Sequence, residues 1–157
     1  MPSVRRIVQR LLRDRERGYS LIEVAVVLAL VGIVTATGLP RLPRMLAAYD
    51  LSNGAQQLAN DLRLARMRAV TSGDKARIQF GTGNYVPERE SEPGSGAFPP
   101  DGATQMLPSS VTVASAPADP TFDSRGFAVQ PYTITLTSKY GETKTITVTS
   151  IGRVNVN

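Results

Sequence analysis

An apolar stretch over residues 19–39 constrains this chain more than any other feature of its sequence. The segment reads YSLIEVAVVLALVGIVTATGL and carries a single charged side chain, that of Glu23. At about 1.5 Å per residue it forms about 30 Å of helix, which is the thickness of the hydrocarbon core of a bilayer. We therefore predict a transmembrane helix over residues 19–39.

The segment before this stretch is strongly basic. Residues 1–18 contain six arginines and two acidic residues, whereas the remaining residues contain twelve basic and eleven acidic ones. The formal charge of +5 is therefore concentrated at the N-terminus and does not argue for nucleic-acid binding by the whole chain. By the positive-inside rule, the N-terminus is cytoplasmic and the residues after 39 lie on the other side of the membrane.

Glu23 distinguishes between the classes of segment that begin in this way. A secretory signal peptide has an apolar region of only about 7 to 15 residues and a small-residue cleavage site, to which Ala36–Gly38 is a poor match. A plain membrane anchor fits the length but does not explain a carboxylate that costs about 2.5 to 3.5 kcal/mol inside a bilayer. Glu23 either extends to the membrane interface or has a functional partner.

Residues 17–24, RGYSLIEV, resemble the N-terminal signal of type IV prepilins and type II secretion pseudopilins. In that signal a basic leader ends in glycine, an aromatic residue follows, and a glutamate stands fifth in the mature chain. The resemblance implies that a prepilin peptidase removes the leader, residues 1–18, by cleavage after Gly18 and methylates the amine of Tyr19. It also implies that Glu23 pairs with the α-amino group of a neighbouring subunit and sets the register of assembly.

A second helix is expected after the apolar stretch. Pro40 and Pro43 predict a kink or break, because each removes a helix hydrogen bond. Apolar residues then recur at steps of three and four from Leu51 to Ala69, and Gly73 supplies a stop. We predict that the helix continues over residues 40–73 and packs one face on a sheet.

The remaining residues, 74–157, predict a β-rich head, since their apolar side chains alternate with a period of two. Eight proline and glycine residues within 87–109 predict a long loop. The expected strands include residues 76–80, 122–129, 132–138 and 143–149, with a hairpin turn over 139–142. The predicted fold class is α+β, a long N-terminal helix that spans the membrane in its first half and packs by its second half on an antiparallel sheet.

The loop is acidic, which raises the question of a calcium site. Carboxylate oxygens suit a hard cation, but the spacing lacks the Asp-x-Asp-x-Asp-Gly pattern of a recognisable calcium loop. The acids in question are Glu88, Glu90, Glu92 and Asp101. We predict no metal site and no cofactor.

The C-terminal third of the chain resembles the GspH/FimT class of minor pilins and pseudopilins. Residues 122–126, the 132–149 hairpin and the terminal SIGRV at 150–154 carry this resemblance. It implies a subunit of a type IV pilus or a type II secretion pseudopilus that serves assembly and protein secretion. The implied partners are prepilin peptidase, other major and minor pilins or pseudopilins, and the bacterial inner membrane, which the chain crosses once with its head in the periplasm.

DNA uptake in natural transformation is the alternative function. DNA-binding members of the class carry a second basic residue two positions after the arginine of the terminal Gly-Arg motif, where this chain has Asn155. The alternative is therefore not favoured, and a solvated helix face is the preferred interpretation of the helix arginines. The residues that would contact an anionic partner are Arg63, Arg66, Arg68, Arg77 and Arg153.

Enzymatic activity is not expected. The chain contains no histidine and no cysteine, which excludes nucleophile systems and zinc sites built on those residues. No pair of acids stands out from the acidic loop as a general acid and base. No phosphate-binding loop of the Gly-x-x-x-x-Gly-Lys-Ser/Thr type is present either.

Overall fold

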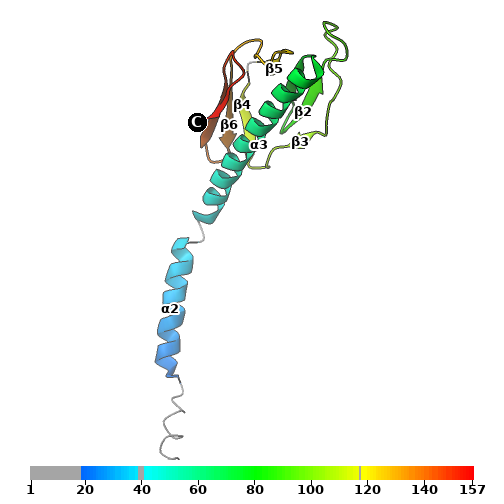
Figure 1. Cartoon of the computed structure of the whole chain (residues 1–157). Coiled ribbons are helices and arrows are strands. Elements are labelled where there is room, and N and C mark those ends of the chain that lie inside the picture. The colour runs from blue at the N-terminus through cyan, green and yellow to red at the C-terminus, as the bar shows by residue number, and fades with distance from the viewer. Residues whose placement is uncertain (1–18, 39–40, 117) are drawn as a thin grey trace, which may run out of the picture. The chain divides into compact units, whose positions relative to one another are not determined.

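The structure is a computed structural model of the 157-residue chain, and it describes residues 19–38, 41–116 and 118–157. The described residues divide into two compact units, one before and one after the boundary between residues 42 and 43 (Figure 1). The predicted leader, residues 1–18, lies outside the described residues.

The first unit contains helix α2, Leu21–Gly38. The helix begins at Leu21 because the carbonyl of Ser20 accepts the N–H groups of Glu23 and Val24, at 2.9 and 3.2 Å. Its side chains are exposed wherever their exposure is described. In the part of the chain that the structure describes, no helix combines the length and apolarity needed to cross a membrane.

Helix α3, Leu42–Ser72, provides one wall of the head. Its buried face consists mostly of alanines, with Gly54 among them, so the helix backbone approaches its neighbours closely. At Gly54 a side chain would meet Pro108 Cδ at 3.4 Å, which shows how little space remains there. The helix ends at Ser72, and Gly73 follows with φ +78°.

Within the described part of the chain, eight strands form two four-stranded antiparallel sheets that pack with α3 around one core (Figure 1). The first sheet has the order β3-β2-β1-β5 and the second the order β4-β6-β7-β8. The strands are β1 Ala76–Phe80, β2 Asn84–Arg89, β3 Gln105–Met106, β4 Val111–Ser115, β5 Thr121–Phe122, β6 Tyr132–Ser138, β7 Thr143–Val148 and β8 Val154–Val156.

The core joins the apolar face of α3 to alternate residues of both sheets. Ile134, Leu136 and Ile146 are fully buried in the second sheet, as are Ile78 and Tyr85 in the first. The period-two patterns of the sequence therefore identified β1 and the β6–β7 hairpin correctly. The α+β fold that they predicted is confirmed.

Two details of the sequence prediction are wrong. The loop expected over 87–109 contains the end of β2 and all of β3. Facing residues of β1 and β2 alternate between hydrogen-bonded and non-hydrogen-bonded pairs, and the 2.9 Å bond from the Gly81 N–H to the Asn84 carbonyl marks a hydrogen-bonded pair. Pro87, which faces Ile78, therefore belongs to a non-hydrogen-bonded pair. Its nitrogen points away from β1, so the proline is tolerated in β2. The strand expected over 122–129 stops after Phe122, because the Asp123 carboxylate accepts the N–H groups of residues 125 and 127 and holds a turn.

Candidate functional site

Glu23 and Tyr19 lie together at the start of α2. Together with Val24, Val27 and Leu28 they line an open hollow of about 310 Å³. Glu23 is in the first turn, where the free N–H groups of the helix favour a negative charge. Gly18, the residue that precedes the expected cleavage site, lies outside the described residues.

The surroundings of Glu23 determine its chemistry. It is the acidic residue of α2, and the neighbouring Ile22 and Val24 are 69% and 46% exposed. A helix with so much exposed apolar surface is stabilised when lipid or other helices cover it. Covering it also removes water from the Glu23 carboxylate, which then needs a cationic partner.

The five arginines predicted from the sequence do not converge on one site. Arg77 lies on β1, where its Nε is 2.6 Å from the Glu88 carboxylate and its guanidinium stacks 4.2 Å from the centroid of the Phe98 ring. Glu88 is 7% exposed, so this ion pair is a buried link between β1 and β2. Arg77 is thereby neutralised within the head.

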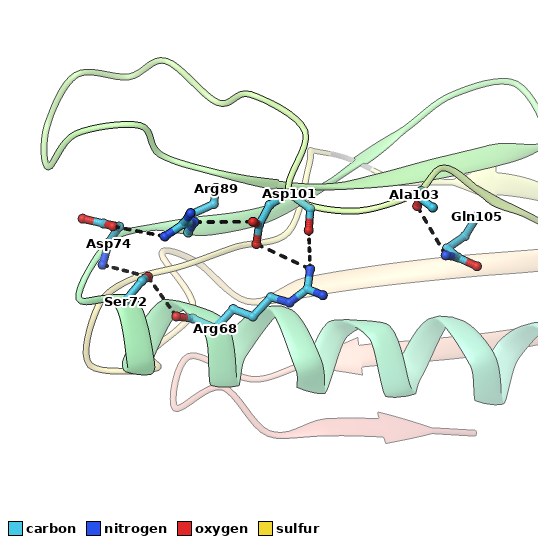
Figure 2. Close-up of polar contacts among 7 residues, drawn as sticks. All are labelled: Arg68, Ser72, Asp74, Arg89, Asp101, Ala103 and Gln105. Atoms are coloured by element: carbon cyan, nitrogen blue, oxygen red, sulfur yellow. Dashed lines mark hydrogen bonds and ion pairs between the residues drawn. The ribbon is translucent and has the colours of Figure 1, made fainter.

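Arg68 is held in a second ion-pair network, at the C-terminal end of α3 (Figure 2). Its Nη1 donates to the Asp101 carbonyl at 2.6 Å and lies 3.5 Å from the Asp101 carboxylate. The same carboxylate lies 3.6 Å from Arg89, which is also 3.9 Å from Asp74. Two arginines and two aspartates thus compensate one another and fix the chain around Asp101 to the helix.

Of the other three arginines, Arg63 and Arg66 lie on α3 and bond to segments that come later in the chain. Arg63 Nη2 donates to the Val154 carbonyl of β8 at 3.1 Å, and Arg66 Nε donates to the Gly126 carbonyl at 2.9 Å. Arg153 is exposed, one residue before Val154. Since backbone carbonyls carry no net charge, these bonds tie α3 to β8 and to the turn at Gly126 without an opposite charge beside either arginine.

Three of the four acids in the 87–109 segment, Glu88, Glu90 and Asp101, form hydrogen bonds or ion pairs within the head. A hydrogen bond from the Gly96 N–H, at 3.0 Å, lowers the pKa of Glu90 below its ordinary value. Glu88 and Asp101 pair with arginines, as described above. In the residues that the structure describes, no group of three or more potential metal ligands comes together.

The contact between Tyr85 and Asp61 could not be predicted from the sequence. The Tyr85 hydroxyl donates to the Asp61 carboxylate at 2.5 Å, and the ring is fully buried. Burial, together with the hydrogen bond to Asp61 and its charge, raises the pKa of Tyr85 well above its ordinary value of 10.0. The two residues belong to different elements, β2 and α3, so no local pattern could have paired them.

Solved structures of three proteins share this fold. The minor pseudopilin EpsH from the type 2 secretion system of Vibrio cholerae has a TM-score of 0.57 at 16% identity, covering 69% of this chain and 96% of its own. The type IV minor pilin FimU of Pseudomonas aeruginosa has a TM-score of 0.57 at 18% identity, covering 70% and 90%. GspH of Escherichia coli has a TM-score of 0.57 at 16% identity, covering 69% of this chain and 88% of its own.

Sequence comparison gives the family. No curated protein matches the chain significantly. A family model described as prokaryotic N-terminal methylation motif matches residues 13–39, which include Tyr19 and Glu23. A second model, described as type II transport protein GspH, matches residues 54–152, which is more than half of the chain. The chain therefore belongs to the GspH family and is a pilin-like subunit of the minor pilin or pseudopilin kind.

Proposed function

We propose that the chain is processed by prepilin peptidase after Gly18, methylated on Tyr19, and incorporated into a type IV pilus or a type II secretion pseudopilus. In this role it serves filament assembly and protein secretion. Before assembly it resides in the bacterial inner membrane, with residues 19–39 in the bilayer and the head in the periplasm. The observation that carries the proposal is the N-terminal methylation motif at residues 13–39.

Two properties of α2 support this proposal. Its exposed side chains are almost all apolar, which suits transfer from lipid to a bundle of similar helices. Its carboxylate, Glu23, comes four residues after Tyr19, which would carry the new α-amino group, and both residues line the same hollow. A pair between Glu23 and the amine of an adjacent subunit removes two isolated charges from an apolar environment and favours one axial register.

The test is the intact mass and N-terminal sequence of the protein from membranes of cells with and without active prepilin peptidase. We expect a chain that begins at N-methylated Tyr19, and only where the enzyme is active. The matched variant is Gly18→Val, which should leave the chain uncut. A chain that keeps its leader in the presence of the enzyme, or one cut beyond Ala36, contradicts the proposal.

DNA capture remains the second candidate. Arg68 and Arg77 are ion-paired with carboxylates, whereas Arg63, Arg66 and Arg153 form no ion pair among the described residues. Three uncompensated cations instead of five reduce the number of phosphates the head could neutralise. DNA binding by the purified protein whose affinity falls steeply with salt concentration would support this function. A DNA affinity that does not depend on salt would exclude it.

A further inference from the structure

Arg66 is held in place by two glycines of the C-terminal half of the head. Gly126 and Gly152 have φ angles of +81° and +76°. A Cβ at Gly126 would lie 3.2 Å from Arg66 Nε, and one at Gly152 would lie 2.7 Å from the same atom. The two loops are joined by the Ala128 N–H, which donates to the Ser150 carbonyl at 3.0 Å. The arginine therefore lies in a space that only glycines leave open.

Most N–H donors of the Arg66 guanidinium have no hydrogen-bond partner among the described residues. Arginine has five N–H donors, and among the described residues only Nε of Arg66 has a hydrogen-bond partner, the Gly126 carbonyl. The two Nη groups, which present the fork that matches a carboxylate, are left over. Arg63, one turn earlier, is occupied by Asn60 and Val154, yet no carboxylate of the described residues compensates its charge.

These two cations line a hollow whose other walls are largely apolar. Its volume is about 400 Å³, and Met67, Val70 and Thr71 complete it. Met67 and Val70 are 64% and 52% exposed. Phe127 and Ile151, which adjoin Gly126 and Gly152 in the chain, are 44% and 53% exposed. We call Arg63, Arg66, Met67, Val70 and Thr71 the α3 hollow.

We propose that the α3 hollow binds a carboxylate that a neighbouring filament subunit presents among apolar side chains. The inference rests on the proposed function, since it takes the partner from the same filament. An oriented guanidinium fork with an uncompensated charge attracts a carboxylate bidentately, and the carboxylate loses little by leaving water because the fork replaces its hydration. The surrounding apolar side chains are then covered by the same contact.

The walls favour a protein over DNA as the occupant. A phosphate backbone buries little apolar surface, so Met67, Val70, Phe127 and Ile151 would remain exposed on DNA. A DNA-binding surface also needs cations that follow the backbone, whereas Arg68 and Arg77 are compensated by Asp101 and Glu88. A protein surface with one acid inside an apolar patch would pair with the arginines of the hollow and also cover its apolar walls.

The test is photo-crosslinking of the full-length chain in cells that assemble the filament, with a photoreactive amino acid in place of Met67. We expect a crosslink to another subunit of the same filament, mapped by mass spectrometry next to an Asp, a Glu or a C-terminal carboxylate. Arg66→Glu should lower the yield about tenfold, because it replaces an attraction by a repulsion. Lysine in place of the mapped acid of the partner should restore the yield in that variant.

Two further variants separate binding from folding. Thr71→Glu leaves the Arg66 bond to Gly126 intact but places a carboxylate of the chain itself in the hollow, so it should lower the yield to a similar extent. Lys139→Glu makes a charge reversal on the exposed β6–β7 turn and should leave the yield unchanged. Comparable thermal unfolding of the variants verifies that the head is folded.

The outcomes distinguish this inference from the proposed function. If the processed chain is present in the filament fraction but gives no crosslink, or one that Arg66→Glu and Thr71→Glu leave unchanged, the inference is wrong. A crosslink to nucleic acid alone overturns it in favour of the DNA alternative. Absence of the processed chain from the filament contradicts the proposed function and with it the partner inferred here.

Discussion

At the scale of single residues, Tyr85 offers the sharpest test of the head. Tyr85→Phe removes the hydroxyl that binds Asp61 and leaves the ring in the core. We expect the free energy of unfolding to fall by about 1 to 2 kcal/mol, the range for a lost hydrogen bond with a partly desolvated partner. Tyr49→Phe, at a position 72% exposed, is the matched control and should change it by less than about 0.5 kcal/mol. Urea unfolding of the purified full-length protein measures both.

The same residue predicts a dependence on pH. Burial, and then Asp61, raise the pKa of Tyr85 above the ordinary value of 10.0 at which the unfolded chain titrates. The folded state therefore retains a proton that the unfolded state loses, so the stability that Tyr85 contributes is present below about pH 10 and declines above it. The difference in unfolding free energy between the native protein and Tyr85→Phe should shrink as pH rises from 9 to about 11. A difference that stays constant over this range would contradict the assignment.

Residues differ in how far sequence could predict their roles. Glu23 could be singled out because its neighbours in the chain form a motif, and the methylation-motif match covers it. The five arginines could be named but not sorted, since their partners lie up to 91 residues away. An arginine can pair with a carboxylate, as Arg77 does, or bond to a backbone carbonyl, as Arg66 does. Which of the two it does depends on the segment that the fold brings beside it.

At the scale of elements, the joint between α3 and the C-terminal loops depends on Gly152. In Gly152→Ala the new Cβ clashes with the Gly126 carbonyl oxygen and lies 3.1 Å from Arg66 Cδ, in addition to the cost of a positive φ. Gly141→Ala is the control, because its φ is +88° but no atom lies within 4 Å of the new Cβ. We expect Gly152→Ala to lower the unfolding free energy by at least about 1 to 2 kcal/mol more than the control. Equal effects would show that the loop rearranges without cost.

The link between β1 and β2 gives a second prediction at this scale. Arg77→Ala leaves the buried Glu88 carboxylate without its cation, so we expect a loss of about 2 to 3 kcal/mol in unfolding free energy. Glu88→Gln in the same chain removes the unpaired charge and should recover part of that loss. Chemical denaturation of the two single variants and the double variant gives the coupling energy. Additive effects would mean that the pair contributes nothing.

The elements themselves were predictable where a pattern was long. The stripe from Leu51 to Ala69 and the alternation in β6 and β7 each repeat often enough to fix the type of element. Strands β3 and β5 are two residues long, too short for a repeating apolar–polar pattern, so they form only because a neighbouring strand pairs with them. Pro87 misled the prediction because a proline disrupts a pair of strands only where its nitrogen faces the other strand. The nitrogen of Pro87 points away from β1.

At the scale of the whole molecule, the proposed role of Glu23 in assembly can be tested separately from processing. Glu23→Gln keeps the size of the side chain but removes the charge that would pair with the amine of an adjacent subunit. We expect normal cleavage after Gly18 and at least about tenfold less protein in sheared filaments, since one lost charge-assisted contact is worth about 1.5 to 3 kcal/mol. Glu142→Gln, in the exposed β6–β7 turn, is the control and should assemble normally. Normal incorporation of the Glu23→Gln variant would remove the proposed role.

The position of β8 has a consequence for how the head is made. It is the last strand of the chain, yet its Val154 receives the side chain of Arg63 from the helix that precedes every strand. The core therefore joins residues that are as far apart in the sequence as Leu51 of α3 and Val154 of β8. While the chain is being synthesised, the buried face of α3 therefore stays uncovered until the strands that pack on it have been made. A chain interrupted before those strands would leave this face exposed to water, and such a chain is a substrate for proteases.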